Sequence, residues 1–257
     1  MKLVSKIILA FFVLFSLCSA AIDKEYHDDI SLIISAFKKQ DKEAISALIE
    51  YPLNRESVIP AIQNEAELIR RFDEVFDGKL IKQIATSDLA KDWSMRGWRG
   101  IMFSNGELWL SLDGKITTIN YQTEKEKKLG DALIKKQKLT LHESIRVYEA
   151  PILEWKTTKF RIRIDYLGES RGKDNYRYSS WGADKQTSAK PDLVLVNGKV
   201  VFEGSGGNHY YEFTNGKHIY RCDVCVLGRD DSPPGSLEVY KGDKLILSEA
   251  VVEVLSH

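Results

Sequence analysis

Gly204-Ser-Gly-Gly-Asn-His-Tyr-Tyr-Glu-Phe-Thr-Asn-Gly-Lys-His-Ile-Tyr-Arg-Cys-Asp-Val-Cys-Val226 is the stretch around which the chain is organised. Its Asn215-Gly216 pair predicts a two-residue type I′ turn, because that turn needs a positive φ at both central positions. The flanking segments then form a hairpin in which His209 lies opposite Cys222. We expect the buried face of this hairpin to carry His209, Tyr211, Phe213, His218, Tyr220, Cys222 and Val224.

The cysteines of the hairpin have two readings. A thiol beside the His209 imidazole can be an activated nucleophile, or Cys222 can be a small apolar side chain in an aromatic core. We favour the core, because no third group that would orient the imidazole is evident. Cys222 and Cys225 have a C-x-x-C spacing, but in a regular strand their thiols point to opposite faces. A disulfide therefore needs a local distortion, free thiols are the alternative, and two cysteines are too few for a zinc site.

The N-terminus has the pattern of an export signal. Two lysines precede the apolar run 7–17, and the small residues Ser19-Ala-Ala21 follow it. This predicts a signal peptide over residues 1–21 and a periplasmic or secreted protein. Anchoring as a lipoprotein through Cys18 is less favoured, because Leu17 stands where a small residue is usual. No other stretch is long and apolar enough to cross a bilayer.

Composition excludes some classes of function. The 37 basic and 37 acidic residues balance, so nothing predicts a nucleic-acid partner. With 43% hydrophobic residues the chain can bury a core of ordinary size. No phosphate-binding, dinucleotide-binding or zinc-protease motif is present, so we expect no cofactor and no metal.

The first half predicts helices followed by a meander. Helical stripes cover residues 30–37, 44–49, 68–76 and 80–84, and Asp41 and Asn64 are placed to cap two of these helices. From Trp98 the period changes to two. Strands are predicted over residues 100–103, 107–112 and 115–121, joined by Asn-Gly and Asp-Gly turns. Helices followed by a meander make an α+β domain over residues 22–123.

This order of elements resembles the NTF2-like, or SnoaL-like, α+β fold. The resemblance covers about residues 28–121 and is carried by the paired helices ending in Tyr51-Pro52-Leu53, the helical segment 72–84 and the meander 98–121. It implies a pocket between a curved sheet and the helices, which some members use for catalysis with Asp and His. No His lies between Asp28 and Tyr121, so that catalysis is not expected here. The candidate pocket residues are Trp93, Arg96, Trp98, Arg99 and Trp109.

Residues 124–144 are rich in charge and predict a solvated linker or helix. After them, residues 145–257 predict an all-β antiparallel unit. We expect strands over 160–166, 176–181, 193–196, 199–202, 209–214, 217–224, 237–240 and 245–255, with a hairpin around Asn197-Gly198. About eight strands at this spacing make a sandwich or a barrel.

Polar and aromatic residues near the loops of this unit suggest a binding surface. The candidates are Tyr176, Tyr178, Trp181, Asn208, His209 and Tyr210. We therefore expect a non-catalytic periplasmic or secreted binding protein whose partner is another protein, for example one in the cell envelope, or another component of the envelope. An inhibitor or immunity-type role against a secreted enzyme is one version. The alternatives are small-ligand binding in the N-terminal pocket and, third, a hydrolase or thiol enzyme that uses Cys222 and His209.

Overall fold

The computed structural model of the protein describes residues 24–256 except 57, 205 and 230. The predicted signal peptide, residues 1–21 with Cys18, lies outside the described residues. By their contacts the described residues form two compact units. The first unit contains the chain up to Leu53 and Ile62–Tyr121, and the second contains Asn54–Ala61 and the chain from Gln122 onward. The protein is of the α+β class, as predicted.

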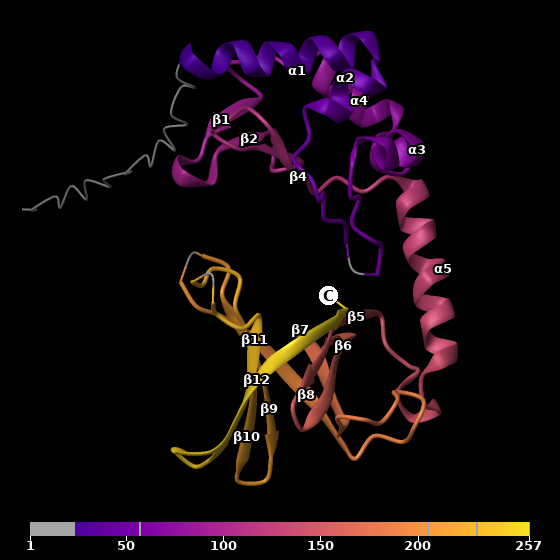
Figure 1. Cartoon of the computed structure of the whole chain (residues 1–257), viewed down its shortest axis with the longest axis vertical. Coiled ribbons are helices and arrows are strands. Elements are labelled where there is room, and N and C mark those ends of the chain that lie inside the picture. Colours follow the sequence, from indigo (N-terminus) through magenta and orange to yellow (C-terminus); the bar gives the residue numbers. More distant parts are fainter. Residues whose placement is uncertain (1–23, 57, 205, 230, 257) are drawn as a thin grey trace, which may run out of the picture. The chain divides into compact units, whose positions relative to one another are not determined.

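The first unit begins with helices, drawn in indigo and purple in Figure 1. A short 3-10 turn, Lys24–Tyr26, precedes α1 (His27–Lys39), α2 (Lys42–Ala47), α3 (Glu65–Val75) and α4 (Gly78–Ala85). The two predicted caps are confirmed: the side chain of Asp41 accepts from the Ala44 N–H and that of Asn64 from the Glu67 N–H. Asp77 similarly begins α4, by accepting from the Lys79 and Leu80 N–H groups.

A four-stranded antiparallel sheet completes the described part of this unit. Its strands are β1 (Trp93–Met95), β2 (Ile101–Phe103), β3 (Leu108–Leu110) and β4 (Ile116–Ile119), in the order β1-β2-β3-β4. The last three lie within the predicted meander, whereas β1 was not predicted, because three residues show no readable period. One buried cluster joins the helices to the sheet and includes Ile33, Phe37, Phe72, Ile101, Leu110 and Ile116. The NTF2-like resemblance of this unit stays a prediction.

The charged segment between the predicted domains is largely a helix of the second unit. Helix α5 (Glu124–Thr140) is capped by the side chain of Thr123, and a 3-10 turn at Glu143–Ile145 follows. The loop 54–61 belongs to this unit as well, although it lies far back in the sequence. Its Arg55 holds the carboxylate of Glu126 through two bonds of 2.6 and 2.7 Å, and both side chains are buried.

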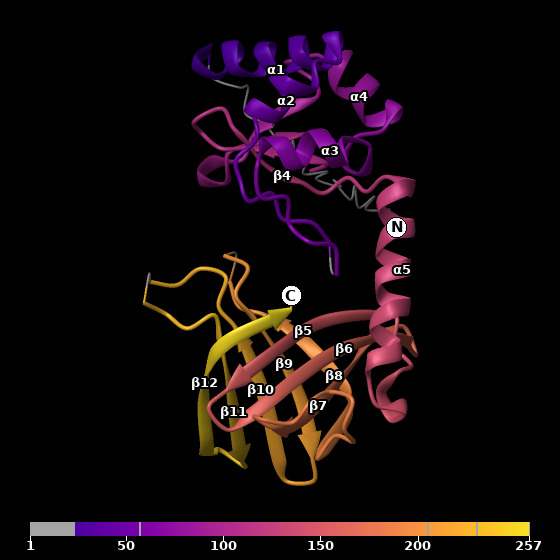
Figure 2. The same cartoon turned by 45° about the vertical axis from the view of Figure 1, so that its right-hand side comes forward.

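Eight antiparallel strands of the second unit close into a barrel (Figure 2). They are β5 (Ala150–Thr157), β6 (Phe160–Ser170), β7 (Lys173–Gly182), β8 (Leu193–Phe202), β9 (His209–Asn215), β10 (His218–Val224), β11 (Gly235–Lys241) and β12 (Lys244–Ser256). Each strand pairs with its neighbours in the sequence, and β12 pairs with β5 to close the ring. Of the two architectures left open by the sequence, the structure has the barrel.

The predicted hairpin around Asn197-Gly198 is wrong. Residues 193–202 form the single strand β8, in which Asn197 has a φ of +60° and donates its backbone N–H to the side chain of Asn175. Gly198 leaves room for the ring of Phe213, which a Cβ would overlap. A glycine inside a strand often marks such a close approach. The sequence analysis also did not predict strand β5. The predicted total of about eight strands therefore agrees only because β8 was counted as two strands and β5 was left out.

The organising hairpin is present with its turn moved by one residue. Asn215 pairs with His218, so Gly216 and Lys217 are the central residues of the turn. Gly216 has a φ of +60° and is not followed by a second positive φ, which fits a type II′ turn better than the predicted type I′. This shift keeps the parity of the pairing, and the predicted inward face is therefore preserved.

A buried polar layer covers part of the outer wall of the barrel. Alternation along the predicted strand 160–166 places Arg163 and Asp165 on its outer face, and in the structure they point outward but are fully buried. Asp165 accepts from Arg163 at 2.8 Å and from Arg177 at 2.6 Å. Arg177 also donates to the carbonyl groups of Ile145 and Val147. These bonds hold the segment that leads from α5 into β5 against the wall.

Replacing Gly198 with alanine should lower the free energy of unfolding by about 1–3 kcal/mol, because the added methyl group meets the Phe213 ring. Urea denaturation measures this change. Gly182→Ala is the matched control, since a Cβ there has no neighbour within 4 Å. Equal stability of the two variants would contradict the close packing at Gly198.

Asp165→Asn should cost about 3–5 kcal/mol of stability, because it removes the carboxylate shared by two buried guanidinium groups and leaves Arg163 with the Glu154 carboxylate at 3.2 Å. Glu212→Gln is the control: it weakens an ion pair to Lys199, whose side chain is 62% exposed, and should cost no more than about 1 kcal/mol. Both are measured by thermal and urea unfolding. A small effect for Asp165→Asn would mean that the polar layer does not hold the wall together.

Candidate functional site

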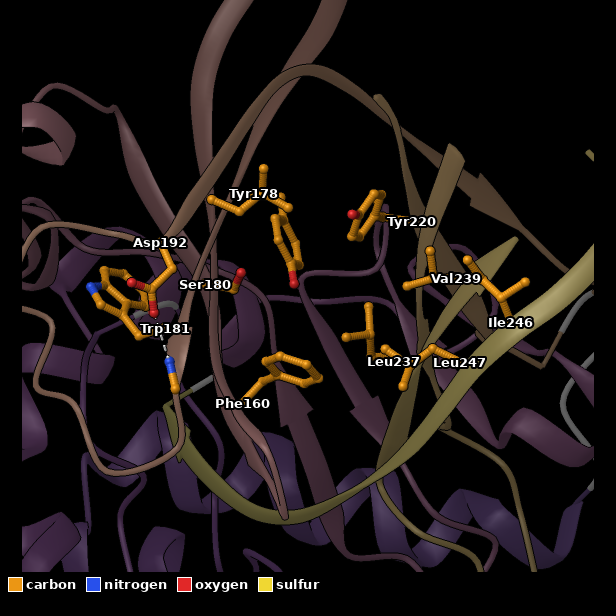
Figure 3. Close-up of a pocket in the computed structure, with 12 residues that line it drawn as sticks. Phe160, Tyr178, Ser180, Trp181, Asp192, Tyr220, Leu237, Val239, Ile246 and Leu247 are labelled. Atoms are coloured by element: carbon orange, nitrogen blue, oxygen red, sulfur yellow. Dashed lines mark hydrogen bonds between the residues drawn. The ribbon is translucent and has the colours of Figure 1, made fainter. Parts of the chain in front are cut away.

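The barrel has a hollow of about 420 Å³ at one end, which we call the barrel cavity. It lies where β6 and β8 begin and β7 ends (Figure 3). Its lining residues are Phe160, Tyr178, Ser180, Trp181, Gly182, Asp192, Leu193, Tyr220, Leu237, Val239, Ile246 and Leu247. The wall is mostly aliphatic and aromatic, and it draws on six different strands.

Aromatic side chains shape one part of the barrel cavity. The rings of Tyr178 and Tyr220 lie 5.8 Å apart at an angle of 49°. Tyr178 also contacts the ring of Phe213 at 5.6 Å. Phe213 and Cys222 are buried and do not line the cavity. In Figure 3 the side chains of Tyr220, Leu237 and Val239 lie across the space from Ser180.

The polar groups of the wall are mainly hydroxyl groups. The Tyr178 hydroxyl points into the space between Ser180 and Leu237, and it lies near the Ser180 side chain (Figure 3). Burial raises the pKa of Tyr178, so this phenol stays protonated at physiological pH. Both side chains are buried by the barrel.

Asp192 is the one ionised residue in the described lining, and it is half exposed. Its carboxylate is held by the Lys185 ammonium at 2.5 Å and by the Gly182 N–H at 3.0 Å. These two interactions lower the pKa of Asp192, the lysine bond most strongly. The charge is therefore already neutralised before any ligand enters.

A second hollow of about 350 Å³ lies at the opposite end, where β9 begins and β10 ends. It is lined by Ile152, Leu153, Trp155, His209, Tyr211, Val224, Cys225, Val226 and Pro234. A ring nitrogen of His209 lies 2.8 Å from the carbonyl oxygen of Gly207. Asn208 joins the two loops at this end by accepting from the N–H groups of Val226 and Leu227.

The predicted Cys222–His209 pair is not formed as a cross-strand pair. Cys222 lies opposite Tyr211, and His209 lies opposite Val224. Cys222 is fully buried, and desolvation raises the pKa of its thiol. Both Cys222 and Cys225 are free thiols in the structure. The inward position of Cys222 matches the core reading and gives no activated nucleophile.

The structure distributes the predicted site residues over several places. Tyr178 lines the barrel cavity with its ring, whereas Trp181 borders the cavity at the end of β7 but packs its ring against Leu141, Ile145 and Tyr148. Tyr176 lies inside the barrel, between the rings of Tyr166 and Tyr211. Tyr210 faces outward under the Arg221 guanidinium, at 3.7 Å.

Asn208 and His209 belong to the opposite end, as described above. Trp98, Arg99 and Trp109 belong to the first unit: Trp98 is 67% exposed beside the Arg99 guanidinium, and Trp109 lies opposite Met102.

Sequence reasoning missed most of the barrel cavity. Side-chain alternation places Phe160 and Tyr220 on the inward faces of their strands, but it does not connect them with Ser180, Leu237, Val239 or Leu247. Alternation along β7 and β11 carried the signal for inward side chains. Nothing local to these strands indicates that their inward side chains leave one end of the barrel unfilled.

Comparisons with models of protein families, with curated proteins and with solved structures found no match to this chain. Within the described residues, no group of three or more His, Cys, Asp or Glu side chains is placed to hold a metal ion. The helices described there are also too short or too polar to cross a membrane.

Native protein that starts at Ile22 should react with a thiol reagent at Cys225 and not at Cys222. The raised pKa of Cys222 keeps its thiol protonated, so increasing the pH from 7 to 9 should not make it react while the barrel is folded. Absorbance with Ellman's reagent measures this. Cys225→Ala should abolish the native reaction and Cys222→Ala should preserve it. Rapid native reaction of Cys222 in the Cys225→Ala variant would revive the thiol-enzyme hypothesis.

Proposed function

We propose that this protein is a non-catalytic binding protein that holds a small, largely apolar molecule in the barrel cavity. The observation that carries the proposal is the mostly apolar hollow at one end of a closed eight-stranded barrel. A barrel of eight strands is wide enough to hold one small ligand. Its volume falls in the range of about 300–1,000 Å³ that is usual for small-molecule sites.

The chemistry of the wall supports binding over catalysis. A serine nucleophile needs a neighbouring base, but the neighbour of Ser180 is the protonated phenol of Tyr178. Asp192 could act as a base, but its carboxylate is held by Lys185 and by the Gly182 N–H. The side chains are therefore arranged to contact a ligand more than to transform it.

The proposal keeps the class of function predicted from the sequence and changes the ligand and its place. Export to the periplasm or the outside remains part of the proposal, on the signal-like residues 1–21. The envelope protein partner and the N-terminal small-molecule pocket stay predictions.

Titration with the neutral dye Nile red tests the proposal. The folded protein should bind the dye saturably at one site, and Val239→Phe should weaken binding at least about tenfold by filling the cavity. Val252→Phe is the matched control, because it adds the same ring to the exposed neighbouring surface of β12 and should leave the affinity unchanged.

Circular dichroism should show that both variants are folded. If Val239→Phe does not fold, Leu193→Phe fills the same space from the start of β8. Dye binding that is not saturable, or that survives in a folded cavity-filling variant, would overturn the proposal.

A further inference from the structure

The polar groups of the barrel cavity narrow the class of its ligand. Three hydroxyl groups, of Tyr178, Ser180 and Tyr220, and the Asp192 carboxylate interrupt the mostly apolar lining. A hydroxyl group has one donor and two acceptor positions. The Tyr178 hydroxyl lies near Ser180 at the cavity wall, so the two groups can offer donors and lone pairs to one ligand atom.

The charged side chains of the lining narrow the class of ligand further. Among the described lining residues there is no lysine, arginine or histidine. A ligand carboxylate buried there would lose its water without gaining a cation, which is costly. A ligand ammonium group would find only Asp192, which Lys185 already neutralises at the rim. Neither sign of charge is matched by the wall.

We infer that the ligand is an uncharged molecule with an apolar body and one hydrogen-bonding oxygen, as in an alcohol, a phenol or a ketone, and that the Tyr178–Ser180 pair binds that oxygen. This inference rests on the proposed function, because it names the ligand of the same cavity. The pair can donate to a carbonyl oxygen or can both donate to and accept from a hydroxyl group. The aliphatic side chains of β11 and β12 then cover the apolar body, as Leu237 and Leu247 lie across the space from Ser180 (Figure 3).

Three matched probes test the inference by displacement of Nile red: 2-naphthol, 2-naphthoate and naphthalene. At pH 7 the phenol is uncharged and the carboxylate is ionised. The wild-type protein should bind 2-naphthol at least about tenfold more tightly than 2-naphthoate, because of the unpaired charge. It should also prefer 2-naphthol to naphthalene by roughly three- to tenfold, the value of one hydrogen bond.

Two variants locate the hydrogen bond. Ser180→Ala and Tyr178→Phe should remove most of the preference for 2-naphthol over naphthalene and leave the naphthalene affinity almost unchanged. Ser179→Ala is the matched control: Ser179 is the adjacent serine of β7, it is buried on the outward side, and its hydroxyl has no hydrogen-bond partner among the described residues. It should keep the preference.

The outcomes separate the two proposals. A wild-type protein that does not bind the dye saturably contradicts the proposed function itself. Two other outcomes overturn only the ligand class in a protein that binds the dye saturably. In one, 2-naphthoate displaces the dye as readily as 2-naphthol does; in the other, 2-naphthol does not displace the dye at all. If Tyr178→Phe does not fold, Ser180→Ala decides, and an unchanged preference in that folded variant would also overturn the inference.

Discussion

Closure of the barrel is the constraint on which the second unit depends. The first and last of its strands, β5 and β12, are separated by the other six in the sequence, yet residues 251–256 of β12 pair with residues 154–157 of β5. An open eight-stranded sheet would expose two rows of unpaired backbone groups, whereas a closed ring satisfies both. Gly235 at the start of β11 supports this closure, since a Cβ there would overlap the Trp155 ring of β5 and the Asp223 carbonyl.

Closure also creates the candidate site, because the inward side chains must fill the enclosed space and do so unevenly. Large buried rings such as those of Phe213 and Tyr211 occupy the interior. Toward one end, Ser180, Gly182 and Val239 stand among larger lining side chains, and the barrel cavity remains. The binding properties of the site thus depend on its unfilled volume and on the lack of an unpaired charge in the described lining, as much as on its hydroxyl groups.

The outer wall of the barrel holds the segment between α5 and β5 in place. The sequence between α5 and β5 carries Leu141, Ile145 and Tyr148, which pack with Trp181 on the outside of the barrel. Beneath this cover lie Arg163, Asp165 and Arg177, bonded to one another and to backbone carbonyl groups. Buried charges are tolerated when they are paired and hydrogen-bonded, so this layer can remain within a packed wall.

Much of the local structure could be read from the sequence. Side-chain alternation identified the inward face of β9 and β10, and it survived a shift of the turn because the parity of the pairing did not change. Side-chain capping chemistry placed the starts of α2 and α3. The prediction of a hairpin at Asn197-Gly198 was wrong because an Asn-Gly pair occurs both in turns and at close packing contacts. Here Gly198 makes such a contact with Phe213, a residue of another strand.

By itself, the sequence determined the α+β class, the order of helices and meander, and which side chains of the organising hairpin face inward, because periodicity and capping act within a few residues. The tertiary structure alone decided that the β-rich half closes through β5 and β12, that Arg163 and Asp165 are buried, and that Tyr178, Ser180 and Leu237 share a cavity. These features depend on pairing partners and on summed side-chain volume across distant strands, and no local pattern encodes either quantity.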